Sequence, residues 1–196
     1  MALKQYSTLA TRSVLHRTIE LPVEWLDFCT HLQDRLGRYN EKTLTAATNM
    51  LEFQAAVDDM RKAEPFSIYA SYDHGHLLNL VDGRPPKAKQ YVIGNSVFAT
   101  TMTRHDVRAA QSLPISILIW QRREGWTTIE FEVAASMIGA LSEGNSEAVA
   151  AARKIDELRE GVFAKIFRGR QGWKEGWQWP LSTSSSRGGL RTRFDV

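Results

Sequence analysis

Two histidines in the sequence lie beside carboxylates, in clusters suited to proton transfer. His74 follows Asp73 at a predicted turn, and His105 precedes Asp106. A neighbouring carboxylate orients an imidazole and favours its charged form, so either histidine is a candidate general acid or base near neutral pH. The structural alternative for His74 is a turn histidine that bonds the backbone beside a glycine of positive φ. His74, His105 and Asp106 are therefore candidate catalytic residues.

Three further polar residues lie at the ends of predicted elements. Arg104 can clamp a carboxylate or another oxyanion, and the amide of Asn95 can point toward an anion or a carbonyl. Ser136 supplies a hydroxyl. Each also has a structural interpretation: Arg104 and His105 complement the dipole of a helix C-terminus, while Asn95 and Ser136 suit helix caps. Both interpretations stay open at the level of sequence.

Signatures of common cofactors are missing from the sequence. It contains neither a G-x-G-x-x-G dinucleotide fingerprint nor a Walker phosphate-binding loop. His74 and His76 have a spacing found in metal sites, but the turn between them and a distant third ligand argue against a metal. Cys29, the single cysteine, falls on the apolar face of a predicted helix and is expected to be a buried structural thiol. We expect no cofactor and no metal.

Hydrophobic periodicity predicts the elements that must position these residues. Strands are predicted at residues 12–21, 66–72, 77–81, 91–93, 115–121 and 127–133. Helices are predicted at residues 22–37, 41–62, 97–105 and 145–167. This order describes an α+β fold, in which helices pack on one face of an antiparallel or mixed sheet.

Charge and length divide the chain into one domain with two extensions. The 196 residues favour a single domain at 12–167, preceded by an extension at 1–11. Residues 168–196 form a tail that holds six basic and two acidic side chains, whereas the rest of the chain is nearly neutral. The tail tryptophans are Trp173, Trp177 and Trp179. They can stack on single-stranded bases, but we favour a tail that wraps back on the domain or on a second subunit, because the body offers no basic face.

Targeting signals are weak. No apolar run approaches the ~20 residues that span a bilayer, and no secretory signal is visible. The first 19 residues contain basic side chains and no acid, a composition faintly like a transit peptide. Because residues 12–21 also fit a strand, we expect a cytoplasmic protein without membrane contact.

An ordered set of short motifs spans residues 66–166. The set consists of Asp73-His74-Gly75, Tyr91-Val92-Ile93-Gly94-Asn95, Ala99, Met102, Arg104-His105-Asp106, Ala109, Pro114, Ser136, Ala150-Ala151-Ala152 and Asp156. In order and spacing it resembles the family known as domain of unknown function 302. The resemblance implies a compact α+β domain that dimerises, and it supplies no established reaction.

The chain departs from this family's pattern at several positions. Ser96 stands where the family commonly has proline, and Ala134-Ala135-Ser136 stands in place of Pro-Ser-Ser. The cysteines of some bacterial members are missing from the matching positions, Gly94 and Ile115. These departures disfavour a thiol-based redox role and indicate an altered site.

These features predict a cofactor-independent enzyme that binds a small, mainly apolar organic molecule and catalyses its cyclisation, isomerisation or elimination. A Diels–Alder type closure in secondary metabolism fits this description, with His74 or His105 as acid or base. The residues expected to bind the substrate in an aromatic-lined pocket are Asn95, Arg104, Trp120, Ser136 and Tyr72. The alternatives are a non-catalytic dimeric ligand-binding or scaffold module and a protein that binds nucleic acid through its basic tail.

Overall fold

A computed structural model describes residues 9–82, 86–141 and 145–169 of the chain. Within this part, a six-stranded mixed sheet has the order β1-β6-β5-β4-β3-β2. The strands are β1 (His16–Leu21), β2 (Gly37–Arg38), β3 (Ser67–Asp73), β4 (Ala88–Gly94), β5 (Ile115–Arg123) and β6 (Trp126–Glu132). Neighbouring strands are antiparallel except for the short β2, which pairs with β3 in parallel.

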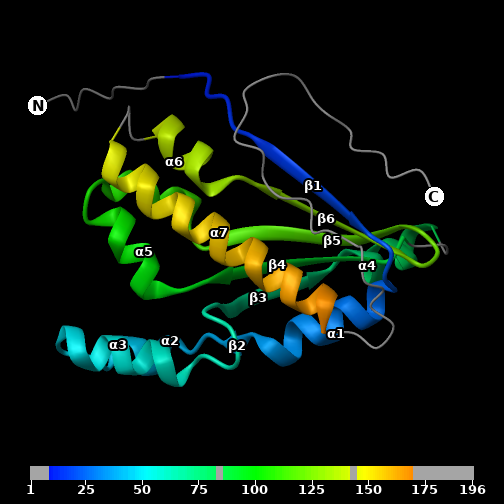
Figure 1. Ribbon diagram of the computed structural model, residues 1–196, viewed down its shortest axis with the longest axis horizontal. Coiled ribbons are helices and arrows are strands. Elements are labelled where there is room, and N and C mark those ends of the chain that lie inside the picture. The colour runs from blue at the N-terminus through cyan, green and yellow to red at the C-terminus, as the bar shows by residue number, and fades with distance from the viewer. Residues whose placement is uncertain (1–8, 83–85, 142–144, 170–196) are drawn as a thin grey trace, which may run out of the picture.

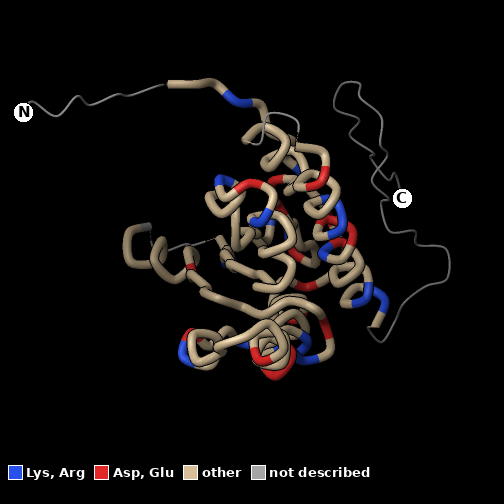
Figure 2. Tube along the Cα trace, turned by 90° about the vertical axis from the view of Figure 1, so that its left-hand side faces the viewer, with Lys and Arg blue, Asp and Glu red and all other residues tan. Residues whose placement is uncertain are grey.

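Most of the helices cover one face of this sheet, as Figure 1 shows from the front and Figure 2 from the side. This layer contains α1 (Trp25–Arg35), α5 (Ser96–Thr103), α6 (Ala134–Leu141) and the long α7 (Ser146–Arg168). Two short helices, α2 (Glu41–Thr45) and α3 (Met50–Asp59), lie beside the β2 edge, and a 3-10 helix, η1 (Val107–Ser112), follows α5. Helix α4 (His74–Asp82) packs on β4 from the opposite face. The predicted α+β fold is therefore confirmed.

The core lies between the sheet and this helical layer. Alternate strand residues such as Ile93, Ile117 and Ile129 are fully buried and meet Phe28 and Phe163 from the helices. Burying one such side chain contributes about 1.5–3 kcal/mol relative to leaving it in water. This apolar alternation explains why most of the predicted strands, together with α5 and α7, are found where the sequence predicted them.

Two predicted elements were wrong. Residues 77–81, predicted as a strand, belong to helix α4, because the Asp73 carboxylate accepts the backbone N–H of His76 at 2.8 Å and caps its first turn. The predicted helix at 41–62 is divided into α2 and α3, because Asn49 caps a new helix by accepting the N–H of Glu52 at 3.0 Å. Helix α6 was not predicted at all.

Three further expectations concern the Cys29 thiol, membrane-spanning helices and the C-terminal tail. Cys29 is buried as predicted, and burial raises the pKa of its thiol to about 11. None of the helices built from the described residues combines the length and the hydrophobicity that crossing a bilayer requires. The expectations for the tail at 170–196 lie outside the described residues.

Candidate functional site

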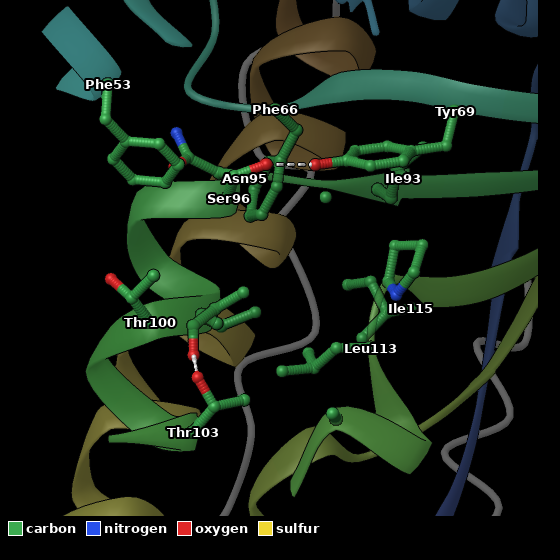
Figure 3. Close-up of a pocket in the computed structure, with 15 residues that line it drawn as sticks. Phe53, Phe66, Tyr69, Ile93, Asn95, Ser96, Thr100, Thr103, Leu113 and Ile115 are labelled. Atoms are coloured by element: carbon green, nitrogen blue, oxygen red, sulfur yellow. Dashed lines mark hydrogen bonds between the residues drawn. The ribbon is translucent and has the colours of Figure 1, made fainter. Parts of the chain in front are cut away.

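A mainly apolar cavity of about 320 Å³ lies where the ends of β4 and β5 meet helix α5 (Figure 3). Its walls also receive side chains from α3 and α7. The wall residues that fix its apolar character include Phe53, Phe66, Ile93, Leu113, Ile115 and Ile155. A cavity of this size and composition is typical of sites for small organic ligands.

The turn from β4 into α5 forms one wall of this cavity. Asn95 caps α5, because its side-chain oxygen accepts the backbone N–H groups of Val97 and Phe98 at 2.9 and 3.2 Å. Its amide nitrogen donates to the carbonyl of Pro65 at 2.7 Å. Asn95 therefore lines the cavity, and its side chain is held in the fold by its oxygen and by one of its two N–H groups.

Two hydroxyl groups meet at the upper wall of the cavity in Figure 3. The Tyr69 and Ser96 oxygens are 2.7 Å apart and share a hydrogen bond. The ring of Tyr39 stacks on Tyr69 with centroids 4.0 Å apart. Burial raises the pKa of the Tyr69 phenol above its ordinary value of 10, so the phenol keeps its proton at neutral pH.

Gly94 allows the Tyr69 ring to lie this close to β4. A Cβ atom at Gly94 would lie 2.9 Å from Cβ of Pro114 and 3.1 Å from a ring carbon of Tyr69. Gly94 and Asn95 belong to a motif that was recognised in the sequence, whereas Tyr69 was not predicted as a site residue. Ser96 was noted only as a departure from the family pattern.

His74, Tyr72 and Trp120 lie on the opposite face of the sheet from this cavity. His74 begins α4, and its Nε2 lies 3.0 Å from the side-chain oxygen of Gln90, in a hollow between α4 and the sheet. Tyr72 pairs with Gln90 in the sheet and is half exposed. Trp120 alternates with the inward-facing Ile119, so its side chain points outward.

The cluster after α5 also lies away from the cavity. Asp106 caps η1 by accepting the N–H of Arg108 at 2.9 Å, and its carboxylate pairs with the Arg108 guanidinium at 2.9 Å. His105 lies 3.7 Å from the exposed carboxylate of Glu147, and Arg104 is exposed at the C-terminus of α5. These contacts match the structural alternatives of capping and dipole complementation.

Ser136 has a structural environment as well. Its hydroxyl donates to the carbonyl of Val133 at 2.7 Å and accepts the N–H of Leu15 at 2.9 Å, which ties the start of α6 to the segment before β1. The structure therefore brings only Asn95, of the eight predicted site residues, to the cavity. Among the described residues, no group of three or more His, Cys, Asp or Glu side chains is arranged to hold a metal ion.

Comparison with known proteins identifies a family but no activity. Residues 42–162 match the model of a family described as domain of unknown function DUF302. The crystal structure of an uncharacterized conserved DUF302 protein from Bacillus stearothermophilus is similar, with a TM-score of 0.53 and 12% sequence identity. The similarity covers 77% of this chain and 97% of that chain, and at this identity it shows the fold alone. None of the curated proteins matches the chain. Because the family model spans more than half of the sequence, the chain belongs to the DUF302 family.

Proposed function

We propose that the domain binds a small, neutral, mainly apolar organic molecule in the cavity beside α5 and catalyses its cyclisation without a cofactor. The observation that carries this proposal is the composition of the wall: none of its described residues is Asp, Glu, His, Lys or Arg. Placing a charged ligand in such surroundings costs several kcal/mol. The volume of about 320 Å³ equals roughly ten water molecules and suits a bicyclic compound.

The same wall favours cyclisation over the other two expected reactions. An isomerisation or elimination that begins with proton abstraction needs a base, and the hydroxyl and amide groups of the wall do not supply one at neutral pH. A Diels–Alder type closure instead converts two π bonds of one molecule into two carbon–carbon σ bonds, with no proton, atom or oxidant exchanged. Such a reaction is accelerated by a rigid apolar wall that holds the reactive conformer.

Two neighbouring threonines on α5 provide a matched test of this cavity. Thr100 lines it and Thr101 does not, yet both are half-buried. Both hydroxyls donate to the carbonyl three residues earlier, at 2.8 and 2.7 Å. Thr100→Phe therefore fills the cavity, whereas Thr101→Phe adds the same bulk to the same helix outside it.

The experiment incubates the full chain with a metabolite extract of its source organism and analyses it by native mass spectrometry. We expect a retained small molecule in the wild type and in Thr101→Phe, and none in Thr100→Phe. Liquid chromatography of the extract should show one metabolite replaced by another of identical mass, as cyclisation requires. Retention that survives Thr100→Phe would show that the ligand binds elsewhere and would refute the proposal.

A non-catalytic ligand-binding module is the second candidate. The observation that favours it is that His74 and His105, the expected acid–base residues, contact other parts of the protein and not the cavity. A binding module would retain the molecule without converting it, so the extract would show depletion of one compound and no new isomer.

The proposal also includes the oligomeric state and the cellular location of the protein. We expect a homodimer, as the family resemblance implies, and a cytoplasmic location. The native mass of the purified chain measures the first directly, since a dimer has twice the 22.2 kDa of the chain. Fluorescence microscopy of the tagged full-length protein tests the second.

A further inference from the structure

We propose that Tyr69 and Ser96 form a two-hydroxyl hydrogen-bond donor that selects a neutral ligand with an acceptor oxygen, such as a ketone or an enone. This inference rests on the function proposed above and names the chemical class of the ligand. Tyr69 would touch the ligand oxygen, and Ser96 would position and polarise the phenol.

The Tyr69–Ser96 pair carries one more proton than its own hydrogen bond uses. Two hydroxyl groups carry two protons, and the 2.7 Å hydrogen bond between Tyr69 and Ser96 uses one of them. The second proton has no acceptor among the described residues, and both side chains are only half-buried at the cavity wall. A ligand that fills the cavity excludes water from this donor, and a desolvated donor without a partner costs free energy, so a ligand with an oxygen at this position is favoured.

The other hydroxyl groups of the wall are already committed as donors. The hydroxyl of Thr100 donates to the carbonyl of Val97 at 2.8 Å, and that of Thr103 donates to the carbonyl of Ala99 at 3.1 Å. The amide nitrogen of Asn95 donates one of its two N–H groups to the carbonyl of Pro65. Among the hydroxyl groups of the described wall residues, only the Tyr69–Ser96 pair therefore has a proton to spare.

The arrangement of the pair favours Tyr69 as the group that meets the ligand. When Ser96 donates to the phenol oxygen, the phenol proton is left for the ligand, and hydrogen bonds in such a chain strengthen one another. A phenol is also the more acidic of the two hydroxyls and hence the stronger donor. Donation to the carbonyl of an enone withdraws electrons from its double bond, which makes that bond more reactive toward a diene in the same molecule.

The ring of Tyr69 is held in place for this role. Stacking on Tyr39, with the rings only 13° from parallel, fixes the plane of the phenol. The missing side chain at Gly94 leaves the space that the ring occupies. A donor that is fixed before the ligand arrives loses little entropy on binding and stabilises the developing charge of the carbonyl oxygen.

Three naphthalenes of similar shape test the inference by calorimetry on the full chain: 2-acetylnaphthalene, 2-isopropylnaphthalene and 2-naphthoate. The first carries an acceptor oxygen, the second is its hydrocarbon counterpart, and the third is an anion. We expect the ketone to bind about 3–10-fold more tightly than the hydrocarbon, as one hydrogen bond provides. The anion should bind most weakly.

Variants then assign the difference to the hydroxyl pair. Tyr69→Phe should remove the preference for the ketone and leave hydrocarbon affinity unchanged, and Ser96→Ala should reduce that preference. Tyr39→Phe removes a hydroxyl from the stacked ring, which does not line the cavity, and should change neither affinity.

The outcomes separate this inference from the function on which it rests. Equal binding of ketone and hydrocarbon, or a ketone preference that persists in Tyr69→Phe, overturns the hydroxyl-pair inference while the cavity remains a binding site. Failure of the wild type to bind any of the three probes overturns the proposed function and the inference together.

Discussion

The buried Arg159 offers the sharpest test of how α6 and α7 are joined to the sheet. Its side chain is fully buried, and it donates to the Asp156 carboxylate at 2.6 Å and to the carbonyl of Glu132 at 3.2 Å. The guanidinium also lies 3.7 Å from the ring centroid of Phe131. The oxygens of Asp156 accept the first two backbone amides of α6, at 2.9 Å each. One ion pair therefore connects α7 to β6 and caps α6.

Replacing Arg159 by methionine removes the charge and keeps most of the aliphatic stem. The change leaves the nearly buried Asp156 carboxylate without its cation, and breaking a buried pair in this way costs about 3–5 kcal/mol. Burial lowers the pKa of Arg159 to about 10, so part of that cost is offset by no longer burying the guanidinium. We therefore expect the lower end, about 3 kcal/mol, or a fall in melting temperature of roughly 6–12 °C for a domain of this size.

Urea unfolding of the full chain, followed by circular dichroism, measures this loss. Asp156→Asn completes a double-mutant cycle, and the double variant should be more stable than the sum of the single effects predicts by about 1–3 kcal/mol. Arg153→Met, at an exposed position of the same helix, is the control and should stay within about 0.5 kcal/mol of the wild type. Additive effects, or a loss below about 1 kcal/mol for Arg159→Met, would refute the reasoning.

Three further predictions concern the buried Gly37, the buried Cys29 and the two histidines that lie away from the cavity. Gly37→Ala should destabilise the chain by about 3 kcal/mol or more in urea unfolding, because its Cβ would lie 1.6 Å from the backbone oxygen of Met60; a loss near zero would contradict this geometry. Iodoacetamide at pH 8 should modify Cys29 at least ~100-fold more slowly in the native chain than in urea, because burial raises the pKa of this thiol from 9.0 to about 11. Equal rates would show that the thiol is accessible. His74→Ala and His105→Ala should leave the affinity for 2-acetylnaphthalene, measured by calorimetry, unchanged, since neither side chain lines the cavity. A loss of binding in either variant would place that residue at the site.

Local patterns predicted the elements whose signal is strong by itself. The apolar run of β5 and the long apolar stripe of α7, with its Asn145 cap, were predicted because periodicity and capping are properties of neighbouring residues. The strand prediction at residues 77–81, four of which are apolar, failed because so short an apolar run fits a strand and a helix equally well. The decision came from the Asp73 cap and from contacts with the sheet, which the sequence does not show.

Only one wall of the cavity, formed by Gly94 and Asn95, could be predicted from the sequence. The end of the strand at Gly94 and Asn95 is visible in the sequence. The charged and histidine clusters were predicted as the site instead, because these residue types act as acids, bases and anion ligands in other proteins. Tyr69 lies at a register shift between Ile68 and Ala70, so strict alternation assigns it to the wrong face. A bulge of this kind depends on the partner strand, and the alternation of one strand does not reveal it.

The sequence by itself determined the α+β class, the family, most of the strands and helices, and the burial of Cys29, because these follow from composition and short-range periodicity. Only the tertiary structure decided which polar groups share a site. Tyr69 and Ser96 are 27 residues apart and meet because β3 pairs with β4, whereas His74 is near Tyr69 in sequence but lies on the other face. The face on which a side chain emerges depends on register and bulges, and these are set by long-range pairing.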